Sequence, residues 1–178
     1  MIGHENLSFE SLFYHILRFQ DNLTRSKAAR ECYNIEGEPM EDYAYGKFSM
    51  EHLRNTIEGV KLFNEQKYWE CHEVLEDHWL EGRGDNARYV YWAIIQVAAS
   101  MIHYRDKNLS GAQGLLAKTK NKIKKIDELK VETDLMETYL SWSKLKRLVM
   151  SIPSEAELKE FKELFEFRFR DPSTWDLE

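Results

Sequence analysis

Apolar side chains recur every three or four positions along most of this chain, a spacing that places them on one face of an α-helix. The alternation of apolar and polar residues that is typical of a strand is not seen over any useful length. The pattern predicts helices that begin near residue 8 and then cover about 49–64, 68–80, 86–106, 110–126, 133–150 and the residues after 154. Because the connections are short, neighbouring helices are expected to pack antiparallel. The predicted fold is an all-α, compact bundle of about six or seven helices with a central antiparallel helix pair.

Residues that favour helix ends mark the limits of these segments. Ser8, Ser49 and Ser110 are placed to cap the helices that follow them, since a serine hydroxyl can accept a hydrogen bond from the first turn. Ser154 and Glu157 have the spacing of a capping box before the last helix. Four of the seven expected helices therefore have a start signal in the sequence.

Length and composition indicate one helical domain. The chain has 178 residues, with only three prolines and eight glycines to interrupt helices. We expect a single domain over 1–178, with an N-terminal helical extension over 1–50, a core over 55–117 and C-terminal helices over 133–178. Residues 34–47 are expected to form an irregular connection.

Charge and hydropathy argue against several functional classes. A formal net charge of −6 makes nucleic acid an unlikely partner, and the lysines within 118–125 are interpreted as an ordinary charged helix face. Cys32 and Cys71 are too few for a secreted disulfide framework, which favours a cytoplasmic location. No signal peptide is visible, and the apolar stretch 90–102 is too short to cross a membrane. The oligomeric state stays open.

The helix predicted over 68–80 carries a carboxylate on its apolar side. At about 100° per residue, Glu76 shares a face with Tyr68, His72 and Trp79, whereas Glu70, Asp77 and Glu81 fall on the opposite face. A buried carboxylate needs a partner, and His72 lies one turn earlier. His72 and Glu76 are therefore expected to interact.

The next helix, over 86–106, is apolar on nearly every side and has one polar stripe. The stripe consists of Tyr89, Trp92, Gln96, Ser100 and His103. A short loop would lay this helix antiparallel to the previous one, so that the two polar faces meet. We expect His72, Glu76, Gln96 and His103 to converge there. The remaining histidines, His52 among them, have no visible partners in the sequence.

Three parts of this region resemble the family catalogued as domain of unknown function 309. They are the run from Phe63 to Trp79, the segment Gln96-Val97-Ala98-Ala99 with His103, and Asn108 with Gly111-Ala112. The resemblance covers roughly 55–117. It implies a compact helical bundle and a motif, matched by His72, Glu76 and Trp79, for which metal binding has been suggested. Lys107 and Ala93 depart from the family pattern at positions where glycine is common.

Three interpretations of the polar residues follow. In the first, His72, Glu76 and His103 hold a divalent metal ion, a donor set used by catalytic zinc and non-haem iron sites. In the second, the cluster is a pocket for a small molecule. In the third, it is a structural hydrogen-bond network with every member satisfied. The supporting residues are Gln96, Trp79, Tyr68, Tyr89 and Ser100.

The functional hypothesis is a small metal- or ligand-binding helical protein with a buried His/Glu cluster, with hydrolytic activity left open. The alternative is a non-catalytic helical module that binds a partner protein and uses the cluster only as a structural network. Cys71 lies beside His72 in sequence but about 100° away around the helix, so it is interpreted as a packed apolar residue. No residue is assigned as catalytic, and whether the protein is an enzyme stays open.

Overall fold

A computed structural model describes residues 46–82 and 84–177 of the chain, and these residues form helices without any strand. The α-helices are α2 (Met50–Asn64), α3 (Tyr68–Glu81), α4 (Arg88–Arg105), α5 (Leu109–Glu128), α6 (Asp134–Leu140), α7 (Trp142–Ser151) and α8 (Lys162–Glu166). Two short 3-10 helices cover Leu158–Phe161 and Pro172–Thr174. The predicted all-α fold is confirmed. The helix predicted from Ser8, and the N-terminal extension as far as residue 45, lie outside the described residues.

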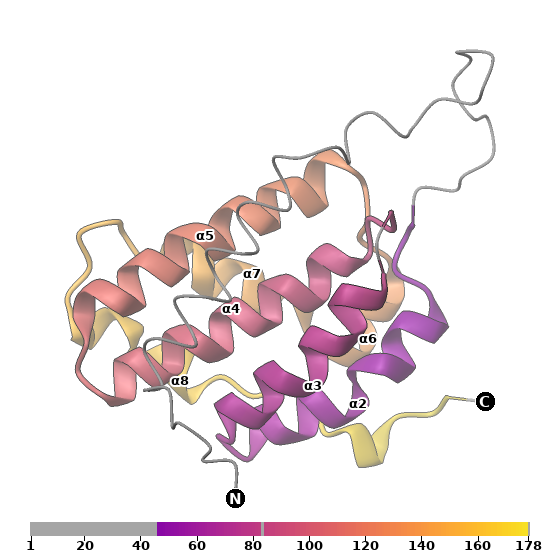
Figure 1. Ribbon diagram of the computed structural model, residues 1–178, viewed down its shortest axis with the longest axis horizontal. Helices are drawn as coiled ribbons and strands as arrows, with labels where there is room; N and C mark the ends of the chain where they lie inside the picture. Colours follow the sequence, from indigo (N-terminus) through magenta and orange to yellow (C-terminus); the bar gives the residue numbers. More distant parts are fainter. Residues whose placement is uncertain (1–45, 83, 178) are drawn as a thin grey trace, which may run out of the picture. The chain divides into compact units, whose positions relative to one another are not determined.

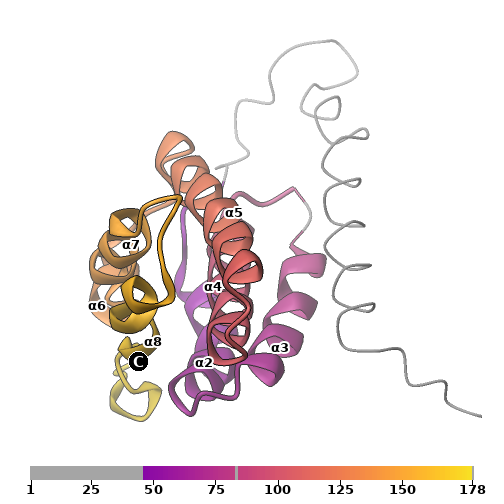
Figure 2. The ribbon, with the colours of Figure 1, turned by 90° about the vertical axis from the view of Figure 1, so that its left-hand side faces the viewer.

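Helix α4 is at the centre because its sequence is apolar on almost every side. Each residue from Val90 to Ile102 is buried. Figure 1 shows α4 between α5 and α3, with α2 packed against α3. The later helices α6, α7 and α8 gather on one side of α4 and α5, away from α3 (Figure 2). The predicted central antiparallel pair corresponds to α3 and α4. No helix in the described part is long and apolar enough to cross a membrane.

Two long-range links fasten the ends of this helical set. The backbone N–H of Phe48 donates to the carbonyl of Val131 at 2.9 Å, and the Phe48 carbonyl accepts from Thr133 Oγ1 at 2.9 Å. The side chain of Asn64 binds Phe169 on both sides: Oδ1 accepts from its N–H at 2.8 Å, and Nδ2 donates to its carbonyl at 3.1 Å. The start of α2 is thereby tied to the α5–α6 connection, and its end to the C-terminal segment.

The helix caps agree with the sequence at some positions and differ at others. Ser49 is the N-cap of α2, as predicted. The N-cap of α5 is Asn108 rather than Ser110, because the Asn108 side chain accepts a hydrogen bond from the Gly111 N–H at 3.0 Å. The helix predicted over 133–150 is two helices, since Ser141 adopts a left-handed conformation with φ of 49° between α6 and α7.

The C-terminal helix is shorter than predicted, and its cap lies elsewhere. The capping box expected at Ser154 is formed by Glu157 and Glu160 at the start of the 3-10 helix Leu158–Phe161. Helix α8 then covers only Lys162–Glu166. Phe161 and Leu164 are fully buried nevertheless.

Candidate functional site: the α3–α4 polar cluster

His72 and Glu76 are neighbours on α3, as the sequence predicts. His72 Nδ1 lies 3.9 Å from Glu76 Oε2, and the two side chains are 2% and 18% exposed. The Trp69 ring stacks on the imidazole, with ring centroids 5.4 Å apart. Burial lowers the pKa of His72 from its ordinary 6.5 to about 4, so the imidazole is neutral at pH 7. The contact is therefore between a neutral ring and a partly solvated carboxylate.

Helix α4 packs against α3 and carries Trp92 and, one turn further on, Gln96. Trp79 of α3 contacts Trp92 of α4 with ring centroids 4.9 Å apart, and Tyr89 stacks on Trp92 with ring centroids 6.0 Å apart. Trp79, Trp92 and Gln96 are each 2% exposed. We call His72, Glu76, Trp79, Trp92 and Gln96 the α3–α4 polar cluster.

Three polar atoms of this cluster are buried without a hydrogen-bond partner. They are Trp79 Nε1, Trp92 Nε1 and Gln96 Oε1. Other indoles of the chain are satisfied: Trp142 Nε1 donates to Glu132 at 2.8 Å, and Trp175 Nε1 donates to the Arg170 carbonyl at 3.2 Å. Leaving a buried donor or acceptor unsatisfied costs about 1–3 kcal/mol. Unsatisfied atoms gathered on two facing helices therefore call for a specific explanation.

Two predicted supporting residues belong to other contacts. The Ser100 hydroxyl donates to the Ala112 carbonyl at 3.1 Å, so it ties α4 to α5 rather than to α3. The Tyr68 ring packs against Phe63 and Phe165, with centroids 5.2 Å and 6.1 Å away. Tyr68 is thus part of the aromatic core beneath the C-terminal segment.

His103 is held in the turn between α4 and α5. The Gly111 N–H donates to Asn108 Oδ1, which fixes the orientation of the Asn108 amide, and its Nδ2 lies 3.1 Å from His103 Nδ1. That nitrogen therefore accepts a hydrogen bond, and in the neutral ring the proton is on Nε2. A β-carbon at Gly111 would lie 2.6 Å from the imidazole, so glycine gives the ring its space.

This arrangement bears on the predicted metal site. A metal takes the lone pair of a neutral imidazole, and in His103 one nitrogen is occupied by Asn108 while the other carries the proton. Among residues 46–82 and 84–177, no three His, Cys, Asp or Glu side chains come together as a metal-binding group. The site of His72, Glu76 and His103 stays a prediction, and the described geometry provides a pair of donors, His72 and Glu76.

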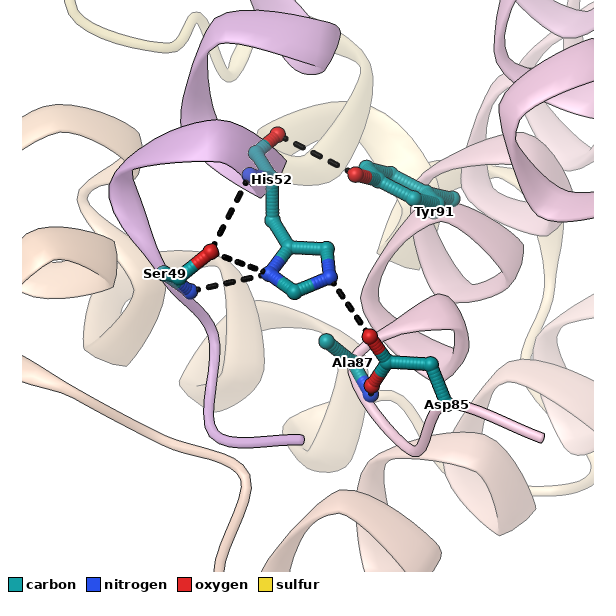
Figure 3. A network of polar contacts seen from close by, with 5 residues as sticks. All are labelled: Ser49, His52, Asp85, Ala87 and Tyr91. Atoms are coloured by element: carbon teal, nitrogen blue, oxygen red, sulfur yellow. Dashed lines mark hydrogen bonds and ion pairs between the residues drawn. The ribbon is translucent and has the colours of Figure 1, made fainter. Parts of the chain in front are cut away.

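A second polar network surrounds His52, which the sequence had left without partners (Figure 3). His52 Nδ1 lies 2.7 Å from Ser49 Oγ, and Nε2 lies 2.8 Å from Asp85 Oδ2. The other Asp85 oxygen accepts from the Ala87 N–H at 2.8 Å, and the Tyr91 hydroxyl donates to the His52 carbonyl at 3.2 Å. The hydrogen bond from His52 holds the pKa of Asp85 below its ordinary value. The Ser49–His52 spacing was visible in the sequence, whereas Asp85 lies 33 positions further on.

The order serine, histidine, aspartate is that of a nucleophile, a base and an orienting carboxylate. Here His52 Nδ1 also accepts the backbone N–H of Ser49 at 3.0 Å, and Ser49 Oγ accepts the backbone N–H of His52 at 3.4 Å. These reciprocal bonds are a capping box at the start of α2. We therefore assign this network a structural role.

Cys71 is fully buried, and burial raises the pKa of its thiol. A thiol of raised pKa is a poor nucleophile, so the interpretation of Cys71 as a packed apolar residue holds for this structure.

The central part of the chain is similar to known proteins. Residues 56–115 match the family described as domain of unknown function (DUF309), which confirms the predicted resemblance for this segment. The uncharacterized protein YpuF of Bacillus subtilis (strain 168) is 34% identical over 58 residues, which are 33% of this chain and 33% of that protein. The match thus spans about a third of the relative's length. No solved structure matches the chain. All five members of the α3–α4 polar cluster lie within the matched segment.

Proposed function

We propose that this protein binds a small polar ligand and that the α3–α4 polar cluster is its binding site. The observation that carries the proposal is the set of three buried, unsatisfied atoms: Trp79 Nε1, Trp92 Nε1 and Gln96 Oε1. A ligand with matching donors and acceptors would satisfy them and recover the free energy that their burial costs. The neutral, buried His72 and the partly exposed Glu76 precede Trp79 on α3 by seven and three residues.

The same observation favours a ligand over a purely structural network. A network that only locks two helices in register is expected to satisfy all its members. Gln96 does not meet this condition, because its carbonyl oxygen has no partner at 2% exposure. The interaction-module alternative depends on a satisfied cluster and is therefore less well supported.

A divalent metal ion is the less favoured ligand. His72 and Glu76 would supply two donors, whereas zinc sites in proteins use three or four. The two indole nitrogens cannot contribute, since an indole N–H is a donor and has no lone pair for a metal. The cluster suits an organic or oxyanion ligand better than a bare cation.

The indole N–H groups provide the test. The chain has five tryptophans, and their indole signals can be resolved by NMR in ¹⁵N-labelled protein and assigned with single Trp→Phe variants. The protein is titrated with anionic, cationic and neutral small polar fragments. We expect at least one of these three classes to shift the Trp79 and Trp92 signals in a saturable way. The signals of Trp142 and Trp175, whose N–H groups are already bonded, should stay in place.

Protein purified without a metal-affinity tag should also be analysed for bound metal. A stoichiometric ion that is lost in His72→Ala would show that the metal interpretation is right and the ligand proposal wrong. Unchanged Trp79 and Trp92 signals with fragments of every charge class would likewise refute the ligand proposal.

A further inference from the structure

The backbone of Ser49 fixes where the neutral His52 ring carries its proton (Figure 3). A backbone N–H can only donate, and that of Ser49 lies 3.0 Å from His52 Nδ1, so this nitrogen has no proton in the neutral ring. The ring proton is therefore on Nε2, which donates it to Asp85 Oδ2 at 2.8 Å. The Ser49 hydroxyl, 2.7 Å from Nδ1, is a second donor to that nitrogen. The surroundings of the ring thus match a neutral imidazole.

A second proton on the ring reverses the role of Nδ1. In the imidazolium both ring nitrogens are donors. The bond from Nε2 to Asp85 gains charge assistance, and the Ser49 hydroxyl can turn so that it accepts from Nδ1. The Ser49 backbone N–H cannot reverse its role, so two donors would face each other across 3.0 Å. Protonation of His52 therefore drives this N–H away from the ring.

The peptide group between Phe48 and Ser49 carries this change to another part of the fold. A peptide group is planar and turns as a unit, so the Ser49 N–H moves together with the Phe48 carbonyl. That carbonyl accepts a hydrogen bond from Thr133 Oγ1 at 2.9 Å, and Thr133 is the N-cap residue of α6. A turn that removes the N–H from His52 also takes the carbonyl away from Thr133. The preceding peptide keeps its own bond, from the Phe48 N–H to the Val131 carbonyl.

The charged and titratable neighbours of the ring come from α2, α3, α4 and the α3–α4 connection. They are Glu51, His78, Asp85, Arg88 and Tyr91. The Asp85 carboxylate attracts a proton to His52, whereas the positive charge of Arg88 acts on Asp85 in the opposite sense. Burial raises the pKa of Tyr91 to about 12, so its hydroxyl carries no charge where histidines titrate. Asp85 is therefore the group that opposes the Ser49 N–H in the protonation of the ring.

We propose that His52 is a pH-sensitive switch between the start of α2 and the start of α6. With the neutral ring, the Phe48–Ser49 peptide is bonded to His52 on one side and to Thr133 on the other. With the imidazolium the peptide turns, both bonds break, and the link to Thr133 is released. Histidine is the side chain that ordinarily changes charge between about pH 5 and 8. The switch does not depend on the proposed ligand, because none of its groups belongs to the α3–α4 polar cluster.

NMR of the full chain, labelled with ¹⁵N and ¹³C, tests the switch between about pH 8 and pH 4. The ring nitrogens of His52 report its protonation, and the Ser49 amide and the Phe48 carbonyl carbon report the two hydrogen bonds. We expect all three to change with one midpoint. Hydrogen-exchange protection of the Ser49 amide, relative to the unfolded chain at each pH, should fall by about tenfold or more across the transition. His52→Gln should abolish the change at Phe48 with this midpoint.

Thr133→Val tests the coupling from the other end. The substitution removes the hydroxyl that binds the Phe48 carbonyl, so protonation of His52 no longer has to break that bond. Because coupling between two sites is reciprocal, His52 should then take up its proton at a higher pH, by about half a pH unit for one ordinary hydrogen bond. Thr138→Val, at an exposed position of the same helix, is the matched control and should leave the midpoint in place.

Several results would overturn the proposal. One is a ring that titrates while the Ser49 amide and the Phe48 carbonyl stay unchanged, and another is a ring that stays neutral down to pH 4. A change at Phe48 whose midpoint differs from that of the ring would assign the effect to another group, Asp85 first. An equal His52 midpoint in Thr133→Val and in wild type would show that the ring and Thr133 are not coupled.

Discussion

His52 Nε2, on the first turn of α2, lies 2.8 Å from Asp85 Oδ2, in the connection between α3 and α4. The second Asp85 oxygen accepts the Ala87 N–H at 2.8 Å, just before α4 begins. One carboxylate therefore joins the starts of two helices. Gly46 approaches the same group so closely that a β-carbon there would overlap the Asp85 side chain.

Replacing Asp85 by asparagine should weaken this junction. Asp85→Asn removes the charge that strengthens the bond from His52, so the free energy of unfolding at pH 7 should fall by about 1–2 kcal/mol. The folded-state pKa of Asp85 lies below its ordinary value, so its stabilising effect is present above the unfolded pKa and is lost as the pH falls through the folded pKa. The difference between wild type and variant, measured by urea unfolding, should therefore shrink in acid.

Asp77, exposed on α3, is the matched control for this change. Asp77→Asn should alter the free energy of unfolding by no more than about 0.5 kcal/mol. Equal effects of the two substitutions at pH 7 would mean that the His52–Asp85 contact contributes nothing to stability.

Burial of His72 predicts a pH dependence of a different kind. Its folded pKa of about 4 lies below the ordinary 6.5, so the unfolded chain takes up the proton first as the pH falls. The free energy of unfolding should decline between about pH 6.5 and pH 4, by about 3 kcal/mol from this group alone. Above pH 6.5 the group should have no effect.

The quantity to measure is the slope of the free energy of unfolding against pH between pH 4 and 6.5, because His72→Gln will also change the absolute stability. The variant should lose most of the slope that wild type shows in this range. His78→Gln, on the more exposed side of α3, should keep it. An unchanged slope in His72→Gln would contradict a buried, neutral imidazole.

Two glycines of α5 should respond to alanine in opposite directions. A β-carbon at Gly111 would lie 2.6 Å from the His103 ring, which must then shift away from Asn108. Gly111→Ala should therefore destabilise the fold by about 1–3 kcal/mol. At Gly114 a β-carbon meets nothing within 4 Å, and Gly114→Ala should stabilise by up to about 1 kcal/mol through helix propensity.

Thermal unfolding of the two variants compares them directly. In a His103→Ala background the crowding disappears, so Gly111→Ala should then cost little or become favourable. A large cost that persists without the imidazole would show that another contact limits the space at Gly111.

Gln96 and Thr119 are a matched pair of buried polar residues with different hydrogen bonding. Thr119 Oγ1 donates to the Leu115 carbonyl at 2.9 Å, whereas Gln96 Oε1 has no partner. In ligand-free protein, Gln96→Met should leave the free energy of unfolding within about 0.5 kcal/mol of wild type or raise it, and Thr119→Val should lower it by about 1 kcal/mol. A loss above about 2 kcal/mol in Gln96→Met would indicate a satisfied structural network.

Hydrophobic spacing predicted the helices that carry the cluster. Tyr68 begins α3 as expected, and α4 begins and ends within two residues of the predicted range. Periodicity is a local property, so it locates a helix and its buried face well. It gave no sign of the break at Ser141, where the Glu137 carboxylate accepts the Ser143 N–H and so supports the left-handed residue between α6 and α7.

Partners across the fold were harder to predict than faces. The polar stripe of α4 was identified, but Ser100 binds the carbonyl of Ala112, on α5, and His103 is engaged by Asn108. A stripe on a central helix has neighbours on two sides, and the sequence does not say which neighbour each side chain meets. Asp85 illustrates the same difficulty, since only the folded chain brings it to His52.

The two hydrogen bonds of Asn64 have a consequence for the order of folding. Helices α3, α4 and α5 follow one another through short turns, so their contacts close small loops and can form early. Asn64 joins Phe169 across 105 positions, and a loop of that length closes late. Contacts made after the transition state slow unfolding without speeding folding. The Asn64 contacts are therefore expected to form after α3, α4 and α5 have packed together. Their main effect is to slow unfolding and so to lengthen the lifetime of the native state.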